Sequence, residues 1–350
     1  MLLGVKMGTF SDNYTGIQDR YICEIDKEQP FFDSLRQTYS TFEGWFQRSA
    51  EKQRKCWCIE DDKGMIAAIC VYKPEKDAQI TNDGKIVEGK LLKICTFKVD
   101  ERARGKKLGE RLLYIAFDYC VKNNIDWIYI HMTASGEEQQ KLVAMCKEYG
   151  FYFFGNYKKD DVYIKPMKLV EKNMGSLESL IRHYPYFQDN DSVKKFIIPI
   201  MPQYHEDLFP DFSVQKSFSV EKDKNLYCNQ GSTIKKAYLC RTGIKSVKKG
   251  DVILFYRCKD RKTIQCMGIV ENAFFSDSVE EVFPLISKRT TFTYSSLTEI
   301  LKEKTLIILF RFIALDTEIT SQKLSETGIE NDLDDIIEIT GEQYKTLKNE

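Results

Sequence analysis

Apolar residues near the start of the chain follow strand-like and helix-like spacings in turn. Residues 20–28 alternate apolar and polar side chains as a half-buried strand does, and residues 31–48 carry aromatic side chains at helical spacing. Two more strands are predicted at 56–60 and 65–74, because the turn Asp61-Asp62-Lys63-Gly64 between them is typical of a hairpin. The pattern predicts the first part of a mixed sheet.

A polar loop is predicted at 75–89, followed by a strand, a basic turn and a long helix. The strand covers 94–99, and the helix begins at Leu108, since apolar residues repeat from there at i, i+4, i+7 and i+8. This arrangement aims unpaired backbone N–H groups and the positive end of the helix dipole at one point. The turn adds basic side chains at Arg102, Arg104, Lys106 and Lys107. The segment therefore favours binding of a phosphate or a pyrophosphate.

The turn also carries a family pattern. Residues Arg104-Gly105-Lys106-Lys107-Leu108-Gly109 resemble the acetyl-CoA pyrophosphate loop of the GNAT acetyltransferases, whose pattern is Arg/Gln-x-x-Gly-x-Gly/Ala. Arg104 and Gly109 match this pattern, whereas Lys107 stands in the place of its central glycine. The alternative is a basic strand-to-helix turn of a generic α/β domain.

The order of the following elements is similar to the second half of the GNAT fold. A strand is predicted at 127–131, then a helix that ends near Tyr149-Gly150-Phe151, then a strand at 161–164. The resemblance implies an α/β GNAT domain over residues 1–168, with acetyl-CoA as its cosubstrate.

The resemblance also implies which residues contact acetyl-CoA. Backbone groups of Phe97, Lys98 and Val99 would pair with the pantetheine arm like an added strand. Gln139 stands where an asparagine usually contacts the cofactor, and the aromatic residues of 31–48 either wall the acceptor site or form core. The diphosphate would lie on the loop residues Arg104, Gly105, Lys106, Lys107, Leu108 and Gly109.

Three residues are candidates for proton transfer. In this family an amine attacks the thioester, the enzyme removes a proton, and the thiolate leaves protonated. The usual acid is a tyrosine whose place falls near Cys146, so Cys146 and the neighbouring Tyr149 are candidate acids, with a core cysteine and a helix-end tyrosine as the alternatives. His131, at a strand end, is a candidate base or a packing residue, and Glu137 and Glu138 are other candidate bases.

The second half is mainly β by its pattern. Strands are predicted at 196–201, 237–241, 251–257, 264–271 and 306–313, with a helix at 294–302. The turn Lys249-Gly250-Asp251 before an apolar strand, with Gly268-Ile269-Val270 in the next, resembles the PUA-like barrel group that includes ASCH and EVE domains. A plain Gly-Asp turn is the alternative. We therefore expect a closed or nearly closed PUA-like barrel over 194–350 with an acidic C-terminal tail, reached through a linker at 169–193.

A basic segment lies within this second half. Residues 234–262 hold ten Lys or Arg and two acidic residues, interleaved with aromatic side chains, a pattern typical of RNA or other nucleic-acid binding. A solvated basic edge, balanced by the acidic tail, is the alternative. The candidate contacts are Lys235, Lys236, Arg241, Lys248, Lys249, Tyr256 and Arg257.

Composition narrows the classes of protein. Lys plus Arg equals Asp plus Glu at 52 each, so global charge predicts neither a nucleic-acid nor a membrane partner. The 11 cysteines lie mostly in apolar runs, as in a reducing compartment, and no stretch approaches the length of a membrane span. With 3 histidines and an isolated Cys56-x-Cys58, no metal is expected. We expect a cytoplasmic protein.

These patterns lead to one function and two alternatives. The first is an acetyl-CoA-dependent N-acetyltransferase directed to RNA or a nucleic-acid-associated amine by its PUA-like domain. The second is an acetyl-CoA-sensing or degenerate GNAT domain in a nucleic-acid-binding regulatory module, which Lys107 and Cys146 favour. The third is a protein or small-molecule N-acetyltransferase whose barrel is a scaffold.

Overall fold

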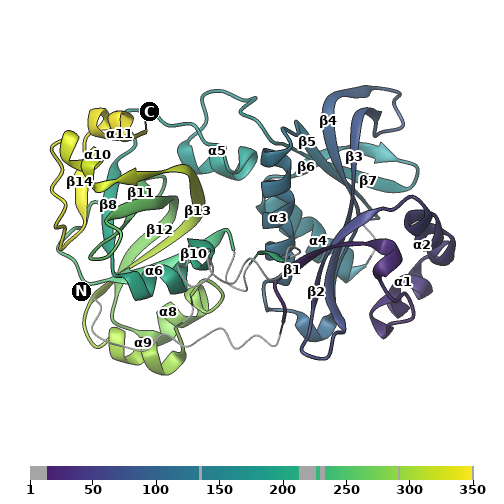
Figure 1. Cartoon of the computed structure of the whole chain (residues 1–350), viewed down its shortest axis with the longest axis horizontal. Coiled ribbons are helices and arrows are strands. Elements are labelled where there is room, and N and C mark those ends of the chain that lie inside the picture. The colour runs from purple at the N-terminus through teal and green to yellow at the C-terminus, as the bar shows by residue number, and fades with distance from the viewer. Residues whose placement is uncertain (1–13, 134–135, 213–225, 229–232, 291, 349–350) are drawn as a thin grey trace.

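The computed structural model describes residues 14–133, 136–212, 226–228, 233–290 and 292–348. They form two lobes that lie side by side, each built around one sheet, with helix α5 (Ser176–His183) between them (Figure 1). No helix within these ranges has both the length and the apolarity needed to cross a membrane.

The first lobe is a mixed α/β structure around an eight-stranded sheet of order β6-β7-β5-β4-β3-β2-β1-β9. Its strands are β1 (Ile17–Tyr21), β2 (Lys55–Glu60), β3 (Ile66–Gln79), β4 (Ile86–Val99), β5 (Trp127–Met132), β6 (Tyr152–Tyr157), β7 (Asp160–Pro166) and β9 (Leu226–Cys228). Its helices are α1 (Asp33–Thr38), α2 (Phe42–Glu51), α3 (Leu108–Lys122) and α4 (Glu137–Glu148), with short 3-10 turns η1 (Ile22–Glu24), η2 (Pro30–Phe32) and η3 (Glu101–Ala103).

Strands β4 and β5 run parallel for only part of their length. Their pairing starts at Leu91 with Trp127 and ends at Ile94 with Ile130, although both strands continue beyond that point. Strand β4 stays paired with β3 up to Val99, so beyond Ile94 only its edge toward β5 is left without a strand partner. The two strands therefore diverge and open the sheet.

The helices and strands of the first lobe differ from the prediction in several places. The strand predicted at 20–28 is wrong beyond Tyr21, because β1 ends there and the 3-10 turn η1 follows. The helical region predicted at 31–48 is divided into η2, α1 and α2, and its aromatic residues form a core cluster that includes Phe32, Phe42 and Phe46. The polar loop predicted at 75–89 is wrong, because β3 and β4 continue through most of it as a long hairpin paired as far as Gln79 and Ile86. This polar stretch is held as a strand by backbone hydrogen bonds to its neighbour. The pattern of apolar residues, on which the prediction relied, gives no sign of such bonds.

The second lobe is built around a six-stranded sheet of order β10-β13-β12-β11-β8-β14. Its strands are β8 (Lys195–Ile200), β10 (Lys235–Cys240), β11 (Val252–Arg257), β12 (Thr263–Ser276), β13 (Thr305–Thr320) and β14 (Ile337–Ile339). Its helices are α6 (Pro202–Leu208), α8 (Val279–Ile286), α9 (Tyr294–Ile300), α10 (Ser321–Glu326) and α11 (Gly341–Lys348), with a 3-10 turn η4 (Pro210–Phe212).

The predicted closure of this sheet is not found. The pairing of the described strands is an open order with β10 and β14 at its two edges, whereas a barrel needs pairing between the edges. The predicted acidic tail is also more ordered than a solvated tail. It contributes β14, which pairs with β8, and α11, whose Tyr344 and Leu347 are buried.

The predicted linker is packed against both lobes. Helix α5 is the short amphipathic helix expected there, and Leu180 and His183 are buried. On one side Lys165 of β7 donates to the carbonyls of Ile181 at 3.0 Å and Arg182 at 2.6 Å, and on the other Ser176 donates to the Gly250 carbonyl. The domain boundaries at 168 and 194 stay a prediction, but the segment between them is packed and hydrogen-bonded to both lobes.

Candidate functional site

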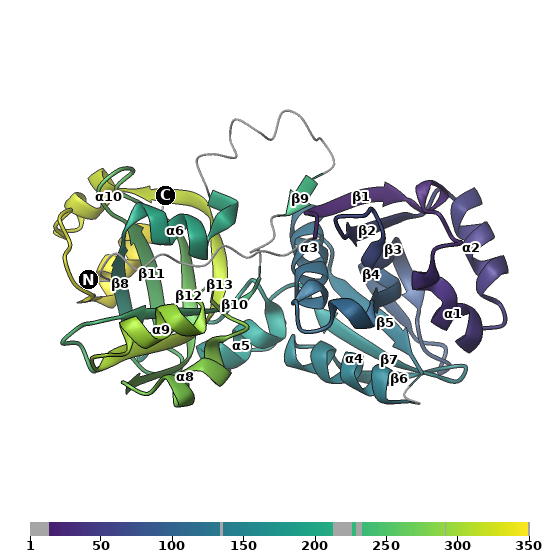
Figure 2. The same cartoon turned by 90° about the horizontal axis from the view of Figure 1, so that it is seen from below.

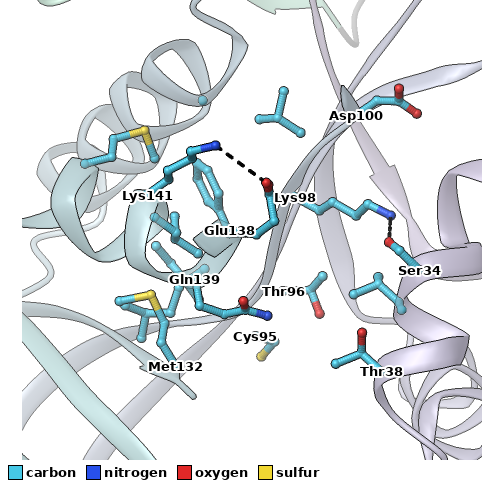
Figure 3. Close-up of a pocket in the computed structure, with 18 of the residues that line it drawn as sticks. Ser34, Thr38, Cys95, Thr96, Lys98, Asp100, Met132, Glu138, Gln139 and Lys141 are labelled. Atoms are coloured by element: carbon cyan, nitrogen blue, oxygen red, sulfur yellow. Dashed lines mark hydrogen bonds and ion pairs between the residues drawn. The ribbon is translucent and has the colours of Figure 1, made fainter. Parts of the chain in front are cut away.

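A cleft of about 1410 Å³ lies in the first lobe where β4 and β5 diverge. Its walls come from α1 and α2 on one side and from α4 on the other. In Figure 3, Gln139 of α4 and Met132 of β5 lie on one side, Ser34 and Thr38 of α1 lie on the other, and Thr96 of β4 lies between them. The cleft thus exposes the part of β4 that has lost its parallel neighbour.

The segment predicted to contact a pantetheine arm is in this cleft. Phe97, Lys98, Val99 and Gln139 all line it. The side chain of Lys98 points away from the edge of β4, because its Nζ donates to Ser34 Oγ at 2.5 Å and to the Phe31 carbonyl. Burial lowers the pKa of Lys98. An open strand edge offers N–H and C=O groups to an extended ligand, so the geometry suits the predicted role.

The predicted diphosphate loop lies at one end of the same cleft. Gly105 has φ +80°, a left-handed conformation that glycine adopts at the least cost, and α3 begins at Leu108. The intrahelical hydrogen bonds of α3 begin with the backbone N–H of Arg111, which donates to the Lys107 carbonyl at 3.0 Å. The preceding amides of Leu108 and Gly109 have no such acceptor, as at any helix start, and both residues line the cleft.

The basic side chains of the loop differ in their surroundings. Arg104 lines the cleft, and its Nη2 contacts Glu101 at 3.2 Å and Glu138 at 2.5 Å. Within the described ranges, no group accepts a hydrogen bond from its Nε or Nη1. Lys106 is exposed and does not line the cleft. Arg104 is therefore the guanidinium of this loop that an anion in the cleft can approach.

Lys107 explains how the loop does without its central glycine. Its backbone has φ 58° and ψ 16°, the left-handed conformation that a glycine would supply, at a cost of about 1–2 kcal/mol for a residue with a Cβ. Its side chain leaves the loop toward the second lobe, where Nζ lies 3.2 Å from the Lys235 carbonyl and 3.7 Å from Glu110. Burial lowers the pKa of Lys107. The substitution keeps the shape of the loop and ties it to β10.

Replacement of Lys107 by glycine tests this explanation. We expect Lys107→Gly to be more stable than Lys107→Ala by about 1 kcal/mol, because alanine keeps the left-handed strain and both lose the contacts of Nζ. Acetyl-CoA affinity should change by less than about tenfold in either variant, since the loop amides remain. Urea unfolding and calorimetric titration measure the two quantities. Equal stability of the two variants would contradict the strain argument.

His131 lies at the cleft end of β5. It lines the cleft, its ring lies near those of Tyr129 at 5.4 Å and Tyr157 at 5.0 Å between centroids, and its Nε2 is buried without a hydrogen-bond partner among the described residues. Burial, with the nearby charge of Lys93, lowers the pKa of His131 to about 4. The imidazole is therefore neutral at pH 7, and Nε2 can accept a proton, although weakly.

The histidines of this chain should show this in solution. Burial lowers the pKa of His131 to about 4 and of His205 to about 3, and also lowers that of His183. Below pH 6.5 the unfolded state therefore binds more protons than the folded state. The free energy of unfolding should be highest above pH 6.5 and should decrease as the pH falls toward 4. An NMR titration should find no imidazole with a midpoint near 6.5. A midpoint there that disappears in His131→Gln would show the ring to be solvated.

The two candidate acids are placed differently. Cys146 is 1% exposed and does not line the cleft, and burial raises its pKa to about 12, so the structure agrees with the core alternative. Tyr149 lines the cleft but is 4% exposed, and its ring contacts Lys235 at 5.7 Å and Arg311 at 5.2 Å. Burial raises the pKa of Tyr149, next to Glu110. Tyr149 thus packs against the second lobe at the loop end of the cleft.

Glu75 is a cleft residue that the sequence did not single out. It lines the cleft, and its carboxylate accepts from Lys73 at 2.5 Å and from the Tyr129 hydroxyl. Burial opposes ionisation, but the hydrogen bonds from Lys73 and Tyr129 outweigh it and lower the pKa of Glu75. Glu75 was hidden because its segment was predicted to be a loop. Continuing the alternation of β3 past Pro74 would have placed it in a strand.

The predicted nucleic-acid surface is mostly interior. Tyr256 is fully buried and donates to the Asn331 carbonyl at 2.9 Å, and Arg257 is 2% exposed and paired with Glu206 and Asp260.

Three further candidates also have partners within the chain. Lys235 is paired with Glu148, Lys236 is buried and donates to the Leu208 carbonyl, and Arg241 contacts Glu303. Of the seven candidates only Lys248 and Lys249 are exposed. Five of the seven candidates are therefore buried or paired within the chain, whereas Lys245, Lys259 and Arg261 of the same segment are exposed like Lys248 and Lys249.

The described residues bring together no group of three or more His, Cys, Asp or Glu side chains that suits a metal ion.

Solved structures show only a low similarity to this chain. No curated protein sequence matched. Among solved structures, an ASCH protein from Zymomonas mobilis is 12% identical and covers 44% of this chain and 93% of its own, with a TM-score of 0.30. A putative acyl-CoA N-acyltransferase from Klebsiella pneumoniae is 15% identical over 44% of this chain and 98% of its own, with a TM-score of 0.30. The GNAT N-acetyltransferase YhbS from Escherichia coli, solved with CoA, is 14% identical over 43% and 82%, with a TM-score of 0.31. We base no argument on TM-scores this low.

The family match is more specific. Residues 20–151 match the model of the acetyltransferase (GNAT) family. The match spans the first lobe from β1 to the end of α4, and it contains the diverging strands, the loop and the start of α3. The first lobe of this chain therefore contains a GNAT acetyltransferase domain, with acetyl-CoA as its cosubstrate.

Proposed function

We propose that the protein transfers the acetyl group of acetyl-CoA to an amine. The observation that carries the proposal is a single cleft that joins the start of α3, the loop from Arg104 to Gly109 and the open edge of β4. Helix-start amides suit a diphosphate, and an open strand edge suits the amide-containing pantetheine arm. One elongated ligand with both parts is acetyl-CoA.

The other end of the cleft would hold the acceptor. Tyr39, Arg48, Glu75 and His131 also line the cleft. The amine lone pair would form a bond to the thioester carbon, and the carbon–sulfur bond would break with its electron pair on sulfur. The ammonium proton would pass to His131, the candidate base that lines the cleft, and from there to the thiolate. The products are an acetamide and CoA with a free thiol.

Acetyl transfer can be measured directly on the full chain. The protein would be incubated with radiolabelled acetyl-CoA and, separately, with a polyamine, free amino acids, a peptide with an unblocked N-terminus and total RNA. We expect label that resists alkaline hydroxylamine, as an amide does, together with an equal amount of free thiol. Binding of acetyl-CoA with no transfer to any acceptor or to whole cell extract would favour the acetyl-CoA-sensing alternative. Absence of binding would end the proposal.

RNA is not part of the proposed acceptor. Five of the seven basic-segment candidates are buried or paired within the chain, which leaves Lys248 and Lys249 exposed. With most of the candidates engaged, the phosphate contact on which nucleic-acid affinity depends would fall to these two lysines and to the exposed Lys245, Lys259 and Arg261. A protein or small-molecule amine, with the second lobe as a scaffold, agrees better with this arrangement. Label in the RNA fraction would overturn this choice.

For the second lobe we propose a PUA-like domain. Its support is the turn that suggested the group: Gly250 has φ +90°, and the Asp251 carboxylate accepts from the backbone N–H of Lys248 at 2.9 Å, so both residues shape the entry to β11. An experimental structure of the full chain tests this proposal. A lobe in which the turn at Gly250 and Asp251 leads into a strand that pairs with neither β8 nor β12 would contradict the proposal.

A further inference from the structure

We propose that the second lobe completes the acetyl-CoA site, with Lys288 binding the phosphate on the 3′ position of the CoA ribose. The inference rests on the proposed function, because it needs acetyl-CoA in the cleft. It adds a nucleotide-binding residue from outside the segment that matches the GNAT family, which ends at residue 151.

Lys288 belongs to the second lobe but lines the cleft of the first. It follows α8 by two residues and shares the cleft with Arg104, Gly105 and Lys107 of the predicted diphosphate loop. Its side chain is exposed. Within the part of the chain that the structure describes, it makes no hydrogen bond or ion pair.

The other cations near this end of the cleft have carboxylate partners. Glu271 accepts from both Arg289 and Arg311, and each lysine has its own glutamate. The lysine pairs are Lys107 with Glu110 and Lys235 with Glu148. Lys288 therefore differs from these neighbours, because its charge is not neutralised by a carboxylate of the described chain. An exposed cation at the mouth of a phosphate-binding cleft is suited to attract a further phosphate.

The strand that carries the second lobe to this cleft is bonded to the loop. The backbone N–H of Lys235, the first residue of β10, donates to Glu110 at 2.7 Å, and its carbonyl accepts from Lys107 at 3.2 Å. Glu110 lies in the first turn of α3, and Lys107 lies just before it. Strand β10 lies on the side of the second lobe that faces α3 (Figure 2). The start of β10 is thus fixed relative to the loop.

The turn with Lys288 is fixed to the same strand. Ala237 of β10 donates its backbone N–H to the Arg289 carbonyl at 3.0 Å, and the Arg289 N–H donates to Ile286, the last residue of α8, at 2.7 Å. The Arg289 side chain is anchored on Glu271. Lys288 therefore lies inside the turn that the Arg289–Ile286 hydrogen bond closes, next to a residue whose carbonyl is bonded to β10, so its backbone is fixed and its side chain orders when a ligand binds.

The chemistry of CoA supplies the matching group. Its diphosphate is attached to the 5′ position of a ribose whose 3′ position carries a separate phosphate, so the two anionic groups lie at the same end of the molecule. The loop has limited charge for the second group, because Arg104 is shared with two glutamates and Lys107 points to the second lobe. Lys288 provides the missing positive charge.

Calorimetric titration of the full chain with CoA and with 3′-dephospho-CoA tests the inference. A charge-assisted contact of this kind is expected to change affinity by about tenfold or more, so wild type should prefer CoA to 3′-dephospho-CoA by that factor. Lys288→Met should lose the preference by weakening CoA alone, and Lys288→Arg should keep it. Lys249→Met, an exposed lysine on the same lobe, is the matched control and should behave as wild type.

The outcomes separate this inference from the proposed function. Equal weakening of both ligands by Lys288→Met would assign Lys288 to general attraction and overturn the 3′-phosphate contact. Unchanged binding of both ligands would remove Lys288 from the site while the proposed function stands. If wild type binds neither ligand, the proposed function itself fails. Unfolding curves of each variant exclude an effect on folding. They are expected to coincide with that of wild type, because Lys288 has no hydrogen bond or ion pair to lose among the described residues.

Discussion

Replacement of Arg104 by glutamate should weaken acetyl-CoA binding by at least about 100-fold, because a charge-assisted contact to phosphate is lost and a repulsion takes its place. Arg104 lies in the cleft beside the helix-start amides, and its nearest charged neighbours, Glu101 and Glu138, are acidic. The reversal would leave a group of three carboxylates where the diphosphate is proposed to bind. Titration calorimetry with acetyl-CoA measures the change.

A control for net charge is available on the other lobe. Lys249→Glu changes the charge of the protein by the same amount at an exposed position outside the cleft. It should leave acetyl-CoA affinity within about twofold of wild type, since charges beyond the Debye length are screened at moderate salt. If Arg104→Glu binds acetyl-CoA as tightly as Lys249→Glu does, acetyl-CoA does not lie on this loop. The proposed function would then lose its main supporting observation.

Gly150→Ala should destabilise the fold by about 3–5 kcal/mol, from overpacking against backbone together with a left-handed conformation. Gly150 follows the end of α4 with φ +90°, and a Cβ there would overlap the carbonyl oxygen of Ile181 in α5. That carbonyl is held in place, because Lys165 donates to it at 3.0 Å. The packing of α5 against the first lobe depends on the missing side chain, and urea unfolding of the full chain measures the loss.

Gly64 separates the two causes. It lies in the hairpin turn before β3 with φ +75°, and a Cβ there would meet no atom within 4 Å. Gly64→Ala should therefore cost only the backbone strain, about 1 kcal/mol. If Gly150→Ala is no less stable than Gly64→Ala, the contact with Ile181 is softer than the structure indicates.

Predictions that depended on short stretches of sequence were the successful ones. The strand, basic turn and helix around Arg104 were predicted in their observed order, and the GNAT domain is confirmed by the family match over residues 20–151. Lys107 takes the left-handed conformation of the glycine that it replaces, so the departure from the pattern did not change the backbone. These features depend on residues that are neighbours in the chain, and local periodicity reports them well.

Predictions that depended on long-range contacts fared less well. The basic segment had the composition of a nucleic-acid surface, but Arg257 and Lys236 are buried on partners at Glu206 and Leu208, far from them in sequence. The polar stretch with Glu75 was predicted to be a loop, and pairing with β4 made it a strand. Composition gives the number of charged side chains, but it does not tell which of them are buried or paired with another charge in the fold.

The sequence by itself therefore determined the strand, turn and helix around Arg104, since these are encoded by spacing and by residues such as Gly105. Only the tertiary structure decided that Cys146 lies in the core, that Glu75 and His131 share a cleft with that loop, and that Lys288 reaches it from the second lobe. The physical reason is that burial, ion pairing and the walls of a cleft are made by residues far apart in the chain. Their energies depend on distance in space, which no local pattern contains.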